Sequence, residues 1–159
     1  MIRSRFREFA DHLKSKAMEL GVAPENHNTE TASMTLAQGG HNLTSEGWHL
    51  ADLRYRGVLL IERVRQTDAI VLLMHARAWL DDNDDTRDKY RLADPEIDLI
   101  SLDASGLVDL IITCDFVDPV YITPAEGGRI RWDGEDFEPV EYDLWVAERG
   151  EVRGARTDV

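Results

Sequence analysis

The stretch that decides the fold is WHLADLRYRGVLLIERV, residues 48–64. Large and branched side chains dominate it, which is typical of one long strand or two short ones. Directly after it, the sequence predicts an apolar helix that is capped by Thr67 and runs to about Leu80. Because this helix is apolar around most of its circumference, we expect it to lie across a sheet. One face is defined by Ile70, Leu73, Met74, Arg77 and Leu80, and Val71, Leu72, Ala78 and Trp79 widen it.

The segments downstream of this helix favour antiparallel strands, because apolar residues alternate with polar ones between clear turn signals. They predict an α+β fold, with a small, mainly antiparallel sheet and helices packed on one face. The segments and turns are EIDLISL (96–102), Ser105-Gly106, LVDLIITCDFV (107–117), VYITPAE (120–126), Gly127-Gly128, RIRW (129–132), Asp133-Gly134 and YDLWVAERGEV (142–152).

Upstream, residues 2–20 predict an amphipathic helix that ends at Gly21 and Pro24. It carries five basic and three acidic residues, so its charge is opposite to that of the whole chain. Two interpretations stay open, packing on the core or docking on an acidic neighbour such as another copy of the chain. Its apolar stripe consists of Ile2, Phe6, Phe9, Leu13, Ala17 and Leu20.

The chain is short enough for a single domain over residues 1–159. Residues 22–47 are polar and poor in large apolar side chains, which predicts a long loop or arm. The α+β core then covers residues 48–150, and residues 151–159 form a short charged tail.

The chain is strongly acidic, with a net charge of −13. Such a surface disfavours binding to nucleic acid or to anionic membranes, because contacts with phosphate need Lys and Arg. One cysteine, Cys114, excludes an internal disulfide, and the N-terminus shows no signal peptide. The longest apolar stretch, residues 69–80, is too short to span a bilayer. We therefore expect a soluble protein of a reducing compartment.

Four aspartates follow the central helix in HARAWLDDNDDTRD, residues 75–88. Acidic groups at a helix C-terminus oppose its dipole, so their presence needs an explanation. A calcium loop does not fit, because its sixth position would be Thr86 instead of Gly and its twelfth would be Leu92 instead of Glu. A magnesium nuclease does not fit either, because no lysine lies in a strand with acidic residues.

Other candidate chemical groups are equally weak. His41, Glu46 and His49 match no metal-ligand spacing on one element, so we expect solvated loop side chains. His75 is expected to be a partly buried helix residue, and Cys114 a small core side chain. No phosphate loop, nucleophile elbow or cysteine-paired metal motif is present in the sequence. The sequence therefore predicts no catalytic, metal or cofactor residues, and a binding or structural protein instead of an enzyme.

Three pieces of the chain together resemble the tail completion protein R family of Peduovirus-type bacteriophages. The first is the strand LRYRGVLLIERV followed by a helix that ends in ARAWLDDNDD. The second is IDLISLDASGLVDLIITCDFVD, a strand–turn–strand with acidic residues around the turn, and the third is YDLWVAERGEV. The resemblance covers about two-thirds of the chain and is weakest over residues 22–50.

The resemblance implies a structural protein of the virion, assembled in the host cytoplasm. Such proteins look like tail terminators, which form a ring, typically a hexamer, on the last ring of the tail tube. The ring stops polymerisation of tube and sheath and offers a docking surface to head and neck proteins. A head–tail connector or neck protein, or a monomeric acidic inhibitor such as an immunity protein or DNA mimic, remains an alternative.

A ring through which DNA passes should not hold it. Residues 81–118 contain twelve acidic and three basic residues, a local charge of −9, and an acidic lumen repels phosphate. Asp81, Asp82, Asp84 and Asp85 are therefore candidates to face the pore or the tube, the alternative being a solvated acidic loop. The candidate contact residues toward other subunits or partners are Phe6, Phe9, Arg129, Arg131, Trp132 and Trp145, with Trp48 as a further aromatic anchor.

Overall fold

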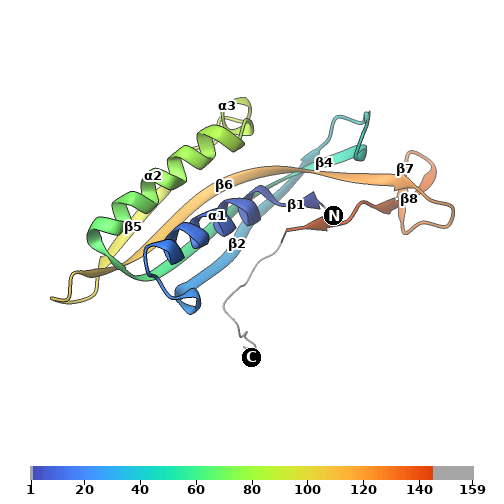
Figure 1. The fold of residues 1–159 in the computed structure, drawn as a ribbon. Coiled ribbons are helices and arrows are strands. Elements are labelled where there is room, and N and C mark those ends of the chain that lie inside the picture. The colour runs from blue at the N-terminus through green and yellow to red at the C-terminus, as the bar shows by residue number, and fades with distance from the viewer. Residues whose placement is uncertain (1, 145–159) are drawn as a thin grey trace.

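The computed structural model describes residues 2–144 and shows an α+β fold built on a long, curled antiparallel sheet (Figure 1). Two strands, β4 (Gly47–Arg65) and β6 (Leu107–Pro124), pair along almost their whole length and form the centre of the sheet. In the body of the molecule, β2 (His27–Gln38) extends the sheet beyond β4, and β5 (Glu96–Ser101) extends it beyond β6. The predicted α+β class with an antiparallel sheet is confirmed.

Beyond the body, β4 and β6 continue into an arm that carries three short strands (Figure 1). There β3 (Leu43–Thr44) pairs with the start of β4, while β8 (Glu135–Pro139) pairs with the end of β6 and with β7 (Ile130–Trp132). The arm is therefore the end of the sheet that the two long helices do not cover.

Helices α1 (Arg5–Glu19) and α2 (Gln66–Asn83) lie side by side on one face of the body sheet (Figure 1). The remaining elements are short: η1 (Pro24–Asn26), α3 (Thr86–Lys89), and a parallel pair of strands, β1 (Ile2–Arg3) with β9 (Tyr142–Asp143). Among the described residues, no helix combines the length and the apolar character that crossing a membrane requires.

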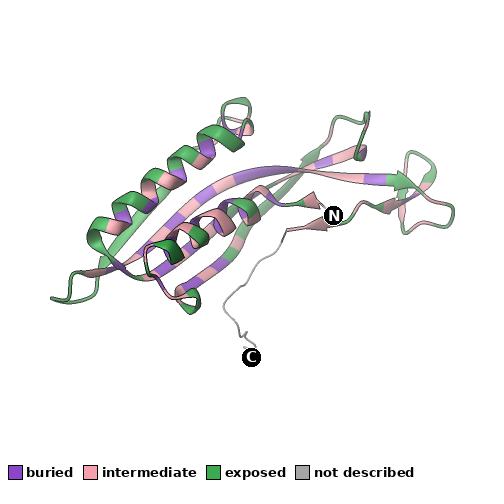
Figure 2. Cartoon of the chain, in the orientation of Figure 1, coloured by how far each residue is buried: buried purple, intermediate pink, exposed green. Residues whose placement is uncertain are grey.

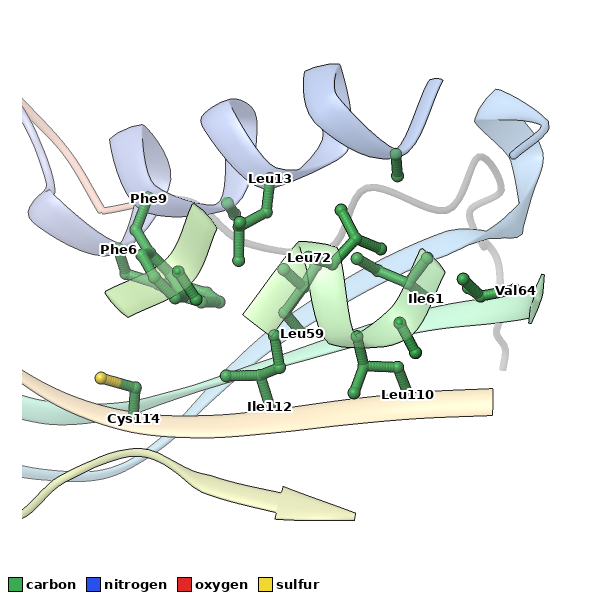
Figure 3. Close-up of a cluster of buried hydrophobic side chains, with 14 of the residues drawn as sticks. Phe6, Phe9, Leu13, Leu59, Ile61, Val64, Leu72, Leu110, Ile112 and Cys114 are labelled. Atoms are coloured by element: carbon green, nitrogen blue, oxygen red, sulfur yellow. The ribbon is translucent and has the colours of Figure 1, made fainter. Parts of the chain in front are cut away.

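The core lies between these two helices and the sheet, as Figure 3 shows. Successive residues of a strand point to opposite faces, so alternate positions of β4 and β6 are buried beneath the helices. Gly57 of β4 lets α1 approach closely, because a Cβ there would lie 2.4 Å from Cδ1 of Phe6. Leu59 and Ile61 of β4 and Leu110, Ile112 and Cys114 of β6 meet Phe6, Phe9 and Leu13 of α1 and Leu72 of α2.

The first helix begins later than its apolar stripe suggests. Ser4 is its N-cap and accepts a hydrogen bond from the backbone N–H of Arg7, and Ile2 belongs to β1 instead of the helix. Pairing of Ile2 with Tyr142 of β9 supplies long-range hydrogen bonds that hold these residues extended.

The prediction of a loop over residues 22–47 is wrong for His27–Gln38, which forms β2. This strand lies at an edge of the sheet, where only His27 and Thr29 are buried and the others face solvent at least partly. An edge strand of this kind needs few apolar side chains, since its hydrogen bonds to β4 hold it. A register shift between Ala32 and Thr35 interrupts the pairing, and Ser33 there has a φ of 55°.

The central helix is also oriented differently from the prediction. It begins at Gln66, one residue before the predicted cap, and buries Ala69, Leu72, Ala76 and Leu80. Ile70 and Met74 of the predicted core face are instead 46% and 65% exposed. Because the helix is apolar nearly all round, periodicity could not determine which side contacts the sheet.

Candidate interaction surfaces

The four aspartates after α2 have different environments. The side chain of Asp84 is buried at the junction of α1, α2 and α3. Its Oδ1 accepts from Nε of Arg5 at 3.3 Å and from the backbone N–H of Thr86 at 3.1 Å. Its Oδ2 lies 3.4 Å from a guanidinium nitrogen of Arg87, which is itself buried. Asp84 thus ties three helices together and is not available to a pore.

The other three aspartates are exposed. Asp81 pairs with Arg77 one turn earlier in α2, at 2.7 Å, and Asp85 lies 3.5 Å from a nitrogen of Arg5. These cations offset the unfavourable position of carboxylates at the end of a helix. Among residues 2–144 Asp82 makes no ion pair, and the side chain of Asp85 is 92% exposed despite its longer contact with Arg5, against 63% for the closely paired Asp81. Asp82 and Asp85 are therefore the stronger acidic candidates for a pore surface.

Phe6 and Phe9 are buried within the chain itself, at 1% and 0% exposure. Their rings contact Phe116 of β6, and Phe9 also meets Trp79 of α2 edge to face. Both residues therefore leave the set of candidate contacts with a neighbouring subunit. Trp145, another candidate, lies outside the described residues.

Arg129 directly precedes β7 and Arg131 belongs to it, and both side chains are exposed on the arm. Arg129 pairs with Glu138 at 2.6 Å and Arg131 with Asp136 at 2.8 Å, both from the neighbouring strand β8. Because the opposite strand of the same hairpin neutralises both cations, these two candidate contact residues do not form a free basic face.

Trp132 and Trp48 are half-buried in an aromatic cluster on the arm. The ring of Trp132 lies 6.0 Å from Trp48, 5.4 Å from Phe137 and 5.4 Å from His41, measured between centroids. These residues come from β4, β7, β8 and the segment that follows β2, so the cluster fixes the arm's strands to one another.

The histidines predicted to lie in solvated loops make local contacts. Nδ1 of His49 accepts from the backbone N–H of Gly40 at 3.0 Å, so its Nε2 carries the proton toward Asp52, 2.7 Å away.

His75 of α2 faces His12 of α1, with ring centroids 6.2 Å apart. Burial, together with the nearby Lys16 and His75, lowers the pKa of His12.

The sequence reasoning missed an exposed apolar surface made by β5 and α2. All six residues of β5 are exposed, although three of them are large and apolar. Ile97 and Leu99 share the face of the sheet on which α2 lies, because they pair with Ile112 and Leu110 of β6. We call this the β5–α2 patch, which consists of Ile97 and Leu99 of β5 with Ile70 and Met74 of α2. Ile100, which pairs with Asp109, is exposed on the opposite face of the same edge. The neighbouring apolar residues Leu99 and Ile100 break the alternation and could have signalled it.

The body sheet has two edges within the described residues. On one side β5 pairs only with β6, and on the other β2 pairs only with β4. Each edge strand presents backbone N–H and C=O groups that no other strand within residues 2–144 pairs with. The bulge at Ser33 interrupts the β2 edge, while no such device protects β5.

A second missed feature is a buried carboxylate, Asp118 of β6. Its Oδ2 accepts from the hydroxyls of Tyr55, at 2.6 Å, and Tyr142, at 2.5 Å, and its Oδ1 accepts from the backbone N–H of Arg5, at 3.2 Å. Burial raises the pKa of Asp118, and it also raises the pKa values of both tyrosines. The cluster joins α1, the sheet and β9 by hydrogen bonds, so we interpret its role as structural.

Comparison with known proteins assigns most of the chain to one family. Residues 5–139 match the family of the P2 phage tail completion protein R (GpR). The chain therefore belongs to the P2 phage tail completion protein R (GpR) family. It is also 27% identical, over 119 residues, to a protein of Haemophilus phage HP1 described as an uncharacterized 19.2 kDa protein in the rep-hol intergenic region. That alignment covers 74% of this chain and 71% of the relative, and no solved structure matched the chain.

Membership of this family implies a role in the assembly and completion of a phage tail. It also implies other tail proteins as partners and agrees with a place in the virion tail. The family is one of structural tail proteins, which are generally not enzymes. The surfaces described above are therefore best examined as protein contacts.

Proposed function

We propose that this chain is a tail terminator that forms a ring, a hexamer by resemblance to its family, on the last ring of the tail tube. The ring stops polymerisation of tube and sheath and offers the head and neck proteins a docking surface. Family membership supports the place in the tail, and the geometry of the body sheet supports the ring.

The observation that carries the proposal is the β5 edge, which is apolar at three of its six positions and has no bulge to interrupt it, although Glu96 and Asp98 add two charges. An exposed apolar edge strand promotes association with other strands, so natural proteins usually cover or charge it. Ile97, Leu99 and Ile100 lie on this edge, each between 38% and 47% exposed. Burial of apolar surface contributes roughly 25 cal/mol per Å², whereas exposed ion pairs contribute only about 0–1 kcal/mol. We therefore place the main subunit contact at the β5–α2 patch.

The second free edge indicates how copies would join. Since β2 and β5 lie on opposite sides of the body sheet, contact of one copy's β5 with the next copy's β2 is heterologous. Heterologous contacts repeat from subunit to subunit and close into a ring when the rotation permits. This arrangement needs no symmetric dimer and leaves the arms free for other proteins.

Passage of DNA through such a ring is the second part of the proposal. The acidic surface opposes binding to phosphate, so DNA would slide through without being held. Asp82 and Asp85 are the strongly exposed members of the aspartate cluster that could face the lumen, with Asp81 partly neutralised, while buried Asp84 stabilises the fold. A ring structure with Asp82 and Asp85 on its outer rim would contradict this part alone.

The test mixes purified tail tubes with this protein carrying a gold-labelled tag and examines them by negative-stain microscopy. We expect gold at one end of each tube and no further elongation. A Leu99→Lys/Ile100→Lys variant should stay monomeric and fail to cap. Met18→Lys is the matched control, because Met18 is 50% exposed on α1 and lies outside the patch.

Unlabelled tubes that continue to grow with the wild-type protein would contradict the terminator function. A head–tail connector would then be identified by capture of portal proteins, and an acidic inhibitor by capture of a basic nuclease as a monomer. A double variant that caps as well as the wild-type protein would instead leave the function intact and contradict the contact surface.

A further inference from the structure

A hollow of about 500 Å³ lies on the arm, beside the β7–β8 hairpin. Its walls are aromatic and acidic, with Trp48, Trp132, Phe137 and His41 on one part and Asp133 and Glu135 on another.

The aromatic walls are held in place by one another. Trp132 and Phe137 meet edge to face, with an interplanar angle of 68°, while Trp48 and Trp132 are tilted by 58°. Phe137 is buried beneath them, whereas Trp48 and Trp132 keep part of their rings accessible. Ring faces that are fixed and accessible attract cations through their negative electrostatic potential.

The acidic walls differ from the other carboxylates of the same hairpin. Glu138 and Asp136 pair with Arg129 and Arg131. Within residues 2–144, the side chains of Asp133 and Glu135 make no hydrogen bond or ion pair. The hairpin therefore carries two paired carboxylates and two unpaired ones, and both unpaired groups line the hollow.

The turn gives these carboxylates a defined position. Asp133 and Gly134 connect β7 to β8, with φ values of 51° and 77°. Positive φ at both residues is typical of the type I′ turn that joins two strands tightly. Trp132 and Glu135 flank the turn and pair across the hairpin. The aromatic and acidic walls thus belong to one rigid unit.

We propose that this hollow receives an arginine side chain from a segment of a partner protein. A guanidinium is planar, so it stacks on an indole face while donating hydrogen bonds to two carboxylates. Lysine provides a charge but neither the stacking plane nor the fork of donors. The inference is independent of the ring, because the arm lies at the end of the sheet opposite β5 (Figure 1).

The test follows the indole N–H signals of the full chain by NMR during titration with acetyl-Gly-Arg-Gly-amide. The matched neutral probe is the same peptide with citrulline, which keeps the shape of arginine but lacks its charge. We expect saturable shifts of the Trp48 and Trp132 signals, with a dissociation constant on the order of millimolar. Trp79 is the internal control, because it packs against Phe9 in the body and should not shift.

Variants of Asp133 and Glu135 test whether these carboxylates bind the arginine peptide. Asp133→Asn/Glu135→Gln should weaken the arginine peptide at least about fivefold, which corresponds to the loss of two exposed charge contacts. Asparagine tolerates the positive φ of position 133, so the hairpin should keep its fold. Glu126→Gln is the matched control, because Glu126 is an exposed acid on the arm away from the hollow.

Equal shifts with arginine and citrulline, or an unchanged titration in the carboxylate variant, would overturn the proposal. The absence of any Trp48 or Trp132 shift at tens of millimolar arginine peptide, far above the dissociation constant expected from such contacts, would also overturn it. A lysine peptide that binds as tightly as the arginine peptide would overturn the choice of arginine.

Discussion

The thiol of Cys114 is the simplest test of the core at the scale of one residue. It is 2% exposed, and burial raises its pKa to about 12. Since the thiolate is the reactive form, we expect almost no reaction with Ellman's reagent at pH 8 in the native protein. Full reaction should appear only in urea, at the same midpoint as the change in circular dichroism. Rapid modification without urea would show that this part of the core is open.

Asp118 provides a prediction about pH. Replacing it with Ala leaves the buried hydroxyl of Tyr55, the partly buried hydroxyl of Tyr142 and the N–H of Arg5 without their acceptor, which should cost about 2–4 kcal/mol of unfolding free energy. In the wild-type protein its raised pKa means that the folded state holds this proton more tightly than the unfolded state does. The contribution of Asp118 to stability should therefore increase as the pH falls from neutral toward its ordinary pKa near 3.8.

The measurement compares urea unfolding of the wild-type protein and Asp118→Asn between pH 7 and pH 4.5. The stability of the wild-type protein relative to the variant should rise toward acid. Glu138 is the control of opposite sign, because hydrogen bonds from the N–H and guanidinium of Arg129 lower its pKa. The wild-type protein should therefore lose stability relative to Glu138→Gln at low pH. A difference for Asp118→Asn that stays flat with pH would contradict the buried, proton-retaining carboxylate.

Sequence reasoning at this scale succeeded where a residue's role follows from its own chemistry and failed where it follows from distant partners. Cys114 was correctly expected in the core, since a small apolar side chain inside a strand is usually buried. Asp84 and Asp82 look alike in the sequence, yet Arg5 reaches one of them from 79 positions away. No local pattern contains that information.

The junction of α2 and α3 yields a prediction at the scale of elements. Arg87 lies between Asp84 and the carbonyl oxygens of Asp115 and Ala93, with its side chain 8% exposed. Arg87→Ala leaves a buried carboxylate with fewer partners, and we expect a loss of about 3 kcal/mol in urea unfolding. Arg77→Ala removes an exposed pair with Asp81 on the same helix end and should cost about 0–1 kcal/mol. Equal costs for the two variants would show that Asp84 is not held as described.

The sequence predicted the central strands of the sheet better than the strand at its edge. Strands β4 and β6 carry alternating large side chains, and strands were expected over both regions. The structure joins the two expected segments 107–117 and 120–126 into the single strand β6. Strand β2 was missed because hydrogen bonds to β4, and not apolar side chains, hold it at the edge. The apolar side chains of α2 were recognised, but Ile70 and Met74 face outward, at 46% and 65% exposure. Figure 2 shows exposed residues along α2, interspersed with buried ones. A helix that is apolar on two sides has a second surface to cover, which connects this error with the proposed subunit contact.

At the scale of the whole molecule, turn signals and alternation predicted the antiparallel sheet, and the resemblance of three long pieces predicted the family. The order of the strands was not predicted correctly, because β8 and not β7 pairs with the end of β6. The two free edges did not follow, because they depend on which strands remain unpaired after folding. The pore-facing residues are likewise a property of an assembly, so Asp82 and Asp85 stay a prediction. Assembly is therefore the scale at which the next experiment is most informative.

Joining of unlike edges can be distinguished from symmetric pairing by crosslinking. Asn28 of β2 and Asp98 of β5 lie on one row across the sheet, through Leu60 and Ile111. In a head-to-tail contact, Asn28→Cys of one copy approaches Asp98→Cys of the next. Cys114 needs no replacement, since it is buried. With a flexible bismaleimide, a mixture of the two single variants should form crosslinked dimers that neither variant forms alone.

A chain carrying both substitutions extends the same argument to ring closure. Each copy then links to the next, and denaturing gels should show a ladder that ends at six copies, independent of protein concentration. An open filament would give a ladder without an end, because its heterologous contacts never close. Crosslinked dimers of Asp98→Cys alone would mean that β5 pairs with β5 of another copy, which makes a two-fold dimer and contradicts the ring.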